Sequence, residues 1–302
     1  MDIVSEIKRL KAARNAVILA HNYQLPEVQD IADFVGDSLG LSIQAAGTDA
    51  RTIVFCGVHF MAETAKILSP DKTVLLPDPA SGCPMADMIT AADMRDLRKK
   101  HRDAAFLCYV NTSAEVKAEC DLCCTSANAV SMVRDLAKKG REIVFVPDKH
   151  LADHTARLTG AELVTWNGFC PTHARITAED IHEARRLHPG AVVLAHPECT
   201  AEVRAVADEI VSTEIMCLYA RDMRAEEFIV GTEVGILHRL RKENPGKRFY
   251  PASEEAVCPN MKRNTLEKVL VSLQDMEHEI TLEREVMHRA RKCIRRMLEY
   301  RA

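Results

Sequence analysis

Short hydrophobic runs recur along the chain at a nearly constant interval. Three of them begin with apolar residues and end in polar ones: Val17–Tyr23, Ala105–Asn111 and Val192–Glu198. Runs of this length, bounded by polar residues, predict buried strands of a parallel sheet. Their landmark residues stand at positions 21, 109 and 196, so the steps are 88 and 87 residues. We therefore expect the chain to contain three similar units.

Three further features repeat in the same order within each unit. A hydroxyl residue precedes a helical stretch, in Asp37-Ser38, Thr125-Ser126 and Ser212-Thr213. An apolar strand then leads into a helical pattern, at Thr52–Leu68, Glu142–Leu158 and Glu226–Leu240. A Cys-Pro pair follows, with steps of 87 and 88 residues, at Cys83, Cys170 and Cys258. Four features that share one order and one period indicate an internal repeat.

Each unit is predicted to run strand, helix, strand, helix, strand and then the Cys-Pro loop. Strands that alternate with helices form parallel sheets, which bind ligands at the carboxyl ends of their strands. The predicted fold is α/β, with three pseudo-threefold-related modules, each a short parallel sheet flanked by helices, around a central active site. We expect an N-terminal helix and first module at 1–103, a second module at 104–190, and a third with C-terminal helices at 191–302.

Composition narrows the class of protein. The 302 residues are 47% hydrophobic and 28% charged, with a net charge of −4 and scattered basic residues, which argues against nucleic-acid binding. No apolar run reaches the ~18 residues of a membrane helix, and the amphipathic start lacks the apolar core of a signal peptide. We therefore expect a cytoplasmic protein without a membrane partner. Its eleven cysteines are then expected to be metal ligands or core residues rather than disulfides.

The cysteines of the three Cys-Pro pairs are the predicted metal ligands. Three equivalent loops that meet at a pseudo-threefold axis would bring Cys83, Cys170 and Cys258 to one centre. Because iron–sulfur clusters are held by thiolates, we expect one [4Fe–4S] cluster per chain, with three cysteine ligands and one iron left open. Such an iron is suited to act as a Lewis acid on a substrate oxygen. A zinc ion is the alternative occupant.

The remaining cysteines are interpreted differently. Cys120, Cys123 and Cys124 include a C-x-x-C spacing, but on the repeat Cys123 and Cys124 align with Val35 and Gly36, which are not ligands. We therefore expect those two cysteines to be buried packing residues. Apolar surroundings predict the same role for Cys56, Cys108 and Cys217. The sequence assigns no role to Cys199 and Cys293.

Several motifs, in one order along nearly the whole chain, resemble those of quinolinate synthases. They are His21-Asn-Tyr-Gln24, Gly36-Asp-Ser38, Gly82-Cys-Pro84, Tyr109-Val-Asn-Thr112, Thr125-Ser126, Cys170-Pro171, His196-Pro-Glu198, Gly231-Thr-Glu233 and Cys258-Pro-Asn-Met-Lys262. The resemblance implies a transferase that condenses iminoaspartate with dihydroxyacetone phosphate to quinolinate, releasing phosphate and water, in NAD (pyridine nucleotide) biosynthesis. It also implies functional coupling to L-aspartate oxidase. One departure is Val211, where the family is expected to have a glycine with more backbone freedom.

A dicarboxylate substrate requires hydrogen-bond donors for its anionic oxygens. Ser38, Ser126 and Thr213 offer hydroxyls at predicted helix N-termini, where backbone amides favour anions. Helix capping is the alternative role of these hydroxyls. The substrate-binding set that the resemblance implies is His21, Ser38, Tyr109, Val110, Asn111, Ser126, His196, Pro197, Glu198 and Thr213.

Ring closure also requires proton transfers, for which side chains with pKa values shifted toward neutrality are suited. The predicted catalytic residues are Tyr23, His21, Glu198, His196 and Tyr109. The resemblance makes Glu198 and Tyr23 the leading candidates among them. His173, three residues beyond Cys170, is expected to border the site.

Two other functions are compatible with a three-cysteine cluster. The first is a different cluster enzyme of the same architecture, such as hydroxymethylbutenyl diphosphate reductase, which needs a diphosphate site and a supply of electrons. The second is a non-enzymatic iron–sulfur sensor. The polar residues at the predicted strand ends argue against a sensor, because a sensor has no use for them.

Overall fold

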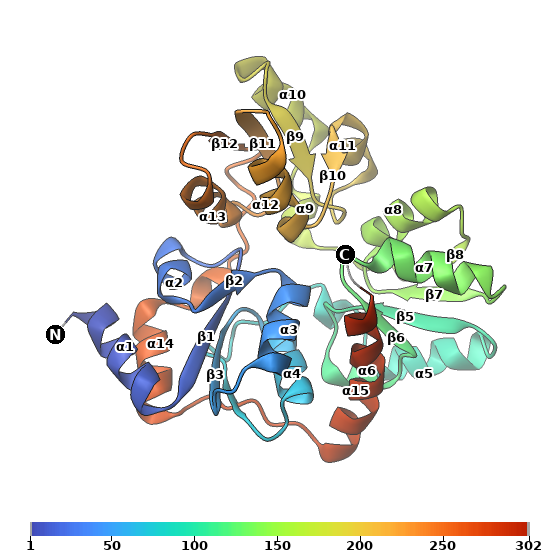
Figure 1. The fold of residues 1–302 in the computed structure, drawn as a ribbon. Coiled ribbons are helices and arrows are strands. Elements are labelled where there is room, and N and C mark those ends of the chain that lie inside the picture. Colours follow the sequence, from blue (N-terminus) through green and yellow to red (C-terminus); the bar gives the residue numbers. More distant parts are fainter. Residues whose placement is uncertain (1, 301–302) are drawn as a thin grey trace.

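Three separate four-stranded parallel sheets form the framework of the computed structural model, which describes residues 2–300 (Figure 1). The first sheet has the order β2-β1-β3-β4 and contains β1 (Ala16–His21), β2 (Phe34–Gly36), β3 (Thr52–Cys56) and β4 (Thr73–Leu75). The second has the order β6-β5-β7-β8 and contains β5 (Ala105–Tyr109), β6 (Leu122–Cys124), β7 (Ile143–Val146) and β8 (Leu163–Thr165). The third has the order β10-β9-β11-β12 and contains β9 (Val192–Ala195), β10 (Glu209–Ile210), β11 (Glu227–Gly231) and β12 (Arg248–Pro251).

Helices connect and flank the strands of each sheet. The first sheet is accompanied by α1 (Ile3–Ala13), α2 (Pro26–Ile31), α3 (Ser38–Gly47) and α4 (His59–Leu68). The second follows α5 (Ala91–Lys100) and includes α6 (Ala114–Ala118), α7 (Ala129–Lys138) and α8 (Lys149–Thr159). The third follows α9 (Pro171–Ala174) and α10 (Ala178–Leu187) and includes α11 (Ala201–Val206), α12 (Thr213–Asp222) and α13 (Ile236–Glu243). The chain ends with α14 (Leu266–Asp275) and α15 (Arg284–Glu299).

The predicted α/β fold of three repeated parallel units is confirmed, and each unit contains one more strand than the sequence pattern predicted. The additional strands are β2, β6 and β10, which are two or three residues long and lie at the edges of their sheets. Each is preceded by a helix of five or six residues. Segments this short carry too few residues to display a helical or strand period, so they were missed.

The central strands have apolar side chains on both faces because helices cover both sides of each sheet. Every residue of β3, β5 and β7 is buried. All the strand pairs are parallel, so within each sheet the carboxyl ends of the strands lie at one edge. The polar residues that follow β1, β5 and β9 are thereby placed at equivalent edges of the three sheets.

The two C-terminal helices pack on the first and second units rather than on the third sheet that precedes them. Val269 and Leu273 of α14 share a buried cluster with Ile7 and Leu10 of α1. Helix α15 packs against α6, β6 and α4. Figure 1 shows this return, with α14 beside the blue α1 and the red α15 beside α6. The end of the chain therefore completes the cores of units formed by its beginning and middle.

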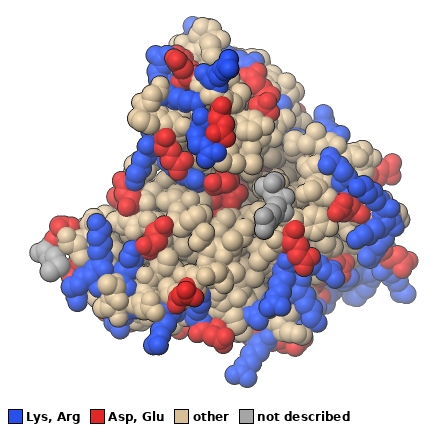
Figure 2. All heavy atoms as spheres, in the orientation of Figure 1, with Lys and Arg blue, Asp and Glu red and all other residues tan. Residues whose placement is uncertain are grey.

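The surface carries both signs of charge. On the face drawn in Figure 2, Lys and Arg side chains are interspersed with Asp and Glu over all three units. None of the helices in the described part of the chain is long and apolar enough to cross a membrane.

We predict that truncation of a buried residue of α14 destabilises the protein through the interface with α1. Leu273 is fully buried, so Leu273→Ala should lower the free energy of unfolding by ~2–5 kcal/mol, as expected for a core cavity. Val271 on the same helix is 40% exposed, and Val271→Ala should change it by less than ~0.5 kcal/mol. Urea unfolding measures both values, and equal effects of the two variants would contradict this packing.

Candidate active site

The carboxyl edges of the three sheets surround one cavity with a volume of about 180 Å³. Its walls include residues that follow β1, β5 and β9 together with the three Cys-Pro segments. The chain turns sharply after each Cys-Pro, in a 3-10 turn at Ala86–Met88, in α9, and in a 3-10 turn at Met261–Arg263. These equivalent turns point the three loops toward a common space.

Nearly all the residues selected from the sequence line this cavity. They are His21, Tyr23, Ser38, Tyr109, Asn111, Ser126, His196, Glu198, Thr213, Cys83, Cys170 and Cys258. Of the selected residues, all of which the structure describes, Val110 and Pro197 are buried but do not line the cavity. Each of these two residues lies between neighbours that do.

Glu198 is a carboxylate that is almost completely inaccessible to solvent, with 3% of its surface exposed. The Tyr109 hydroxyl at the end of β5 donates to its Oε1 over 2.5 Å, and His173 Nδ1 in α9 lies 2.8 Å from its Oε2. Burial opposes ionisation, but His173 and the hydrogen bond from Tyr109 outweigh it and lower the pKa of Glu198 below its ordinary value. The group is therefore an anion at neutral pH.

A chain of hydrogen bonds extends from Glu198 to Tyr23. His173 Nε2 lies 2.8 Å from Thr232 Oγ1, which is 2.5 Å from the Tyr23 hydroxyl. If His173 Nδ1–H donates to Glu198, its Nε2 accepts from Thr232, and Thr232 in turn accepts from Tyr23. Every member of this chain is buried. The arrangement provides a continuous path for a proton between the phenol and the carboxylate.

The pKa values of the buried aromatic groups are displaced by their surroundings. Burial lowers the pKa of His21 and of His196 to about 3, although nearby Glu198 acts in the opposite direction. Burial and then the charge of Glu198 raise the pKa of Tyr23 and of Tyr109 well above the ordinary value. At neutral pH both imidazoles are neutral and both phenols are protonated, so the tyrosines act as donors.

A second buried carboxylate, Glu233, holds two walls of the cavity together. It accepts from the backbone N–H of Cys258 over 3.0 Å and from that of Gly235 over 2.7 Å. Lys262 Nζ lies 2.9 Å from this carboxylate and also donates to the Tyr23 carbonyl. A side chain at Gly235 would lie 2.8 Å from the Tyr23 backbone, so this close approach requires glycine. The network thereby joins the loop after β1 to the third Cys-Pro segment.

The hydroxyls predicted to bind substrate are not the caps of the adjacent helices. Ser38 and Thr213 are the first residues of α3 and α12, and the N-cap positions are Asp37 and Ser212. The N-cap of α7 is Asn128, two residues after Ser126. The alternative role in capping is therefore wrong for these three hydroxyls, each of which lines the cavity.

The three Cys-Pro cysteines are protonated thiols in the absence of a metal. Burial raises the pKa of Cys83 to about 12, that of Cys170 well above the ordinary value, and that of Cys258 as well. A metal that bound them would displace their protons. The sulfur atoms of these three cysteines do not all lie within 4.8 Å of one another. One ligand atom each from Cys170, His173 and Glu198 does meet that distance.

A separate group of three cysteines, able to bind a metal, lies away from the cavity. The sulfur atoms of Cys108, Cys123 and Cys293 are all within 4.8 Å of one another, and all three residues are fully buried. Burial raises the pKa of Cys123 and Cys293 well above the ordinary value. For Cys108, hydrogen bonds from Cys120, Cys123 and Cys293 outweigh burial and lower the pKa. Cys108 and Cys123 are buried as predicted, but no pattern in the sequence indicated their convergence with Cys293.

The sequence reasoning missed several polar groups of the site. Thr232 and Lys262 stood within the motifs Gly231-Thr-Glu233 and Cys258-Pro-Asn-Met-Lys262 but received no role. Both contact Tyr23 of the first unit, which lies more than 200 positions earlier in the chain. The sequence signal for these residues was their place in the two motifs, of which Gly231-Thr-Glu233 could equally have been a helix-capping element.

A buried cavity lined by phenols, imidazoles, carboxylates and thiols at the edges of three α/β sheets is characteristic of an enzyme for a small molecule. The family model described as "Quinolinate synthetase A protein" matches residues 5–299. A quinolinate synthase of Dehalococcoides mccartyi (strain CBDB1) is 53% identical over 296 residues, which cover 98% of this chain and 97% of the relative. One of Methanoregula boonei is 54% identical over 293 residues, which cover 97% and 96%.

The chain belongs to the quinolinate synthetase A family. The resemblance inferred from the motifs is thereby confirmed, together with the assignment as a quinolinate synthase of NAD biosynthesis. The alternatives, a hydroxymethylbutenyl diphosphate reductase and an iron–sulfur sensor, are excluded by this membership.

We predict that the ionised carboxylate of Asp37, a residue that lines the cavity, lowers the free energy of unfolding at neutral pH. Burial raises its pKa to about 6, against 3.8 for the ordinary carboxyl, although the Gly40 N–H donates to it. The folded state therefore binds the proton more tightly than the unfolded state, and stability is lost as pH rises from about 4 to about 6. Asp37→Asn keeps an acceptor for Gly40, so it should raise the free energy of unfolding by ~1–3 kcal/mol at pH 7.5 and by little at pH 4.

Urea unfolding at the two pH values measures this difference. Asp96→Asn, at a residue whose side chain is 66% exposed, is the control and should not stabilise the protein at pH 7.5. A gain for Asp37→Asn that is equal at both pH values would mean that charge burial is not its cause.

Proposed function

We propose that this protein condenses iminoaspartate with dihydroxyacetone phosphate to quinolinate, with release of phosphate and water, at a [4Fe–4S] cluster bound in the central cavity. The observation that carries the proposal is that cysteines from three equivalent loops line the same cavity as the buried Glu198 network. Each chain would bind one cluster through Cys83, Cys170 and Cys258.

The chemistry and placement of these cysteines fit such a cluster. They are soft ligands, and they border an open space. In a cubane each cysteine binds a different iron, so its sulfurs are spaced more widely than those around a single ion. The three sulfurs do not all lie within 4.8 Å of one another, which argues against a single zinc ion bound by all three. When bound, the cluster supplies one iron without a protein ligand, a Lewis acid for a substrate oxygen.

The hydroxyls around the cavity would bind the carboxylates of iminoaspartate. Ser38 and Thr213 lie at the N-termini of two ten-residue helices, where the helix dipole also favours an anion. The Thr213 hydroxyl accepts from the Asn22 side-chain amide over 3.1 Å, so its own proton is free to be donated to a ligand. Ser126, Asn111 and neutral His21 and His196 complete the polar wall.

Glu198 and Tyr23 would exchange protons with the reacting molecules. Glu198 is ionised and Tyr23 is protonated, which are the states needed to accept and to donate a proton. Their pKa values are displaced away from neutrality, contrary to the expectation from the sequence, since that of Glu198 is lowered and that of Tyr23 is raised. Return of a proton from protonated Glu198 to the Tyr23 phenolate along this path would require His173 to carry its own proton on Nε2 before the transfer, and it would leave that ring with the proton on Nδ1, where it donates to Glu198. Tyr109 keeps Glu198 ionised by its hydrogen bond.

Two broader parts of the proposal concern the cell. Functional coupling to L-aspartate oxidase follows from the family resemblance, since the substrate iminoaspartate is unstable. A cytoplasmic location stays a prediction from the sequence.

The direct test of the reaction is to mix the anaerobically purified holoprotein with iminoaspartate and dihydroxyacetone phosphate and to measure quinolinate. Failure to form quinolinate with a full complement of iron and sulfide would contradict the proposal.

We predict that loss of any one Cys-Pro cysteine removes the cluster. Cys83→Ala, Cys170→Ala and Cys258→Ala should each contain little iron and sulfide after anaerobic purification, because two thiolates do not retain a cubane. Cys123→Ala is the matched control and should retain both. Iron and sulfide analysis of the four variants measures the outcome, and cluster loss in the control alone would place the ligands elsewhere.

Glu198→Gln should separate chemistry from cluster binding. The amide has nearly the same shape as the carboxylate but no charge and little basicity, so we expect turnover to fall by ~10²–10⁴. Iron and sulfide content should stay at the level of the unchanged protein. Quinolinate formation and metal content are measured on the same samples, and undiminished turnover would remove Glu198 from the mechanism.

A further inference from the structure

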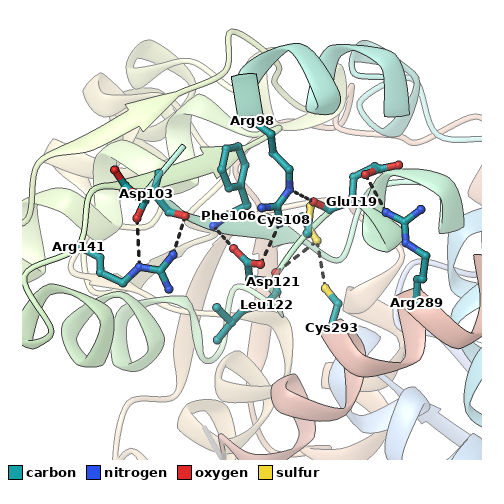
Figure 3. A network of polar contacts seen from close by, with 12 residues as sticks. Arg98, Asp103, Phe106, Cys108, Glu119, Asp121, Leu122, Arg141, Arg289 and Cys293 are labelled. Atoms are coloured by element: carbon teal, nitrogen blue, oxygen red, sulfur yellow. Dashed lines mark hydrogen bonds and ion pairs between the residues drawn. The ribbon is translucent and has the colours of Figure 1, made fainter. Parts of the chain in front are cut away.

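A second concentration of thiols lies between the second sheet and the C-terminal helix. Cys108 is on β5, Cys123 on the adjacent β6, and Cys293 on α15. Cys108 Sγ and Cys293 Sγ are 3.7 Å apart although the two residues are separated by 185 positions. Figure 3 shows these two sulfur atoms facing each other across the boundary between the strand and the helix. The described function of the cavity uses none of the three cysteines.

The spacing of these sulfurs matches the coordination of one metal ion. Four sulfurs around a tetrahedral zinc ion, with Zn–S bonds of about 2.3 Å, lie about 3.8 Å from one another. The Cys108–Cys293 separation is 3.7 Å, and all three sulfurs lie within 4.8 Å of one another. A cubane requires a wider spacing, and the group does not border the substrate cavity. The geometry therefore suits a structural ion and not a second catalytic cluster.

A fourth thiol stands beside the group. Cys120 is 8% exposed, its thiol donates to the Val116 carbonyl over 3.2 Å, and it also interacts with the Cys108 thiol. Structural zinc sites are almost always four-coordinate, so a neighbouring fourth thiol is what such a site requires.

A basic group is present to balance a buried anionic complex. Four thiolates around a divalent cation carry a net charge of −2, which is costly to bury without compensation. The ammonium of Lys117 is fully buried and acts electrostatically on both Cys108 and Cys123. Arg98, which stacks on Phe106 and acts on Cys120, lies nearby, but its guanidinium is already paired with Asp121 at 2.9 Å (Figure 3).

We propose that Cys108, Cys123 and Cys293, with Cys120 as the fourth ligand, bind one zinc ion that fastens the C-terminal helix to the second sheet. Binding replaces the thiol protons, which are released to solvent, and involves no redox change. The ion joins α15 to β5 and β6, whose carboxyl ends carry Tyr109 and Thr125-Ser126. Its role is structural, and it is independent of the cluster proposed for the cavity.

The test is element-selective, so zinc and iron are followed separately in the full-length protein. Protein purified anaerobically from cells grown with added zinc should contain about one zinc per chain. X-ray absorption at the zinc edge should give a first shell of sulfur at about 2.3 Å. Cys293→Ala should lower the zinc content at least tenfold and leave iron and sulfide unchanged. Cys56→Ala, at a buried thiol of β3 outside both groups, should leave both metals unchanged.

Two further measurements distinguish this site from the cavity. Cys258→Ala should lose iron and keep zinc, whereas loss of zinc from that variant would place the zinc in the cavity and overturn the proposal. Added zinc should raise the melting temperature of the unchanged protein relative to chelator-treated protein, and should not do so for Cys293→Ala. Less than a tenth of a zinc per chain, a first shell of nitrogen or oxygen, or a Cys108–Cys293 disulfide in place of zinc would each overturn it.

Discussion

The ionised carboxylate of Glu198 imposes the strictest constraint on this structure. A buried charge is tolerated only when neighbouring groups pair with it and satisfy its hydrogen bonds. Its partners come from elements far apart in the chain, Tyr109 at the end of β5 and His173 in α9. The edges of separate sheets must therefore be held in fixed positions before the site exists. The buried strands and the Glu233–Lys262 network serve that requirement.

Much of this arrangement followed from the sequence because the repeat carries positional information. Once His21, Tyr109 and His196 were recognised as equivalent, parallel strands placed them at equivalent sheet edges. The same period selected Cys83, Cys170 and Cys258 among eleven cysteines, and all three line one cavity. The repeat period therefore identifies residues that occupy equivalent positions in the three units.

What the sequence did not reveal depends on contacts between units that the repeat does not describe. Thr232 contacts Tyr23 across 209 positions, and Lys262 contacts the same residue across 239. The convergence of Cys293 with Cys108 involves a helix that has no counterpart in the other units. The edge strands β2, β6 and β10 were missed for a different reason, because two or three residues do not display a period.

The return of the last two helices has a consequence for how the chain folds. The apolar face of α1 is completed by α14, and the surface of β6 and α6 is covered by α15. During synthesis the ribosome delivers α14 and α15 after the segments that they cover, so those segments emerge with apolar surface exposed. Domains generally fold in order from the N-terminus during synthesis. The first and second units cannot complete their cores in that order, because α14 and α15 are part of those cores. The apolar surfaces of α1, β6 and α6 are therefore protected from aggregation only once α14 and α15 have been synthesised.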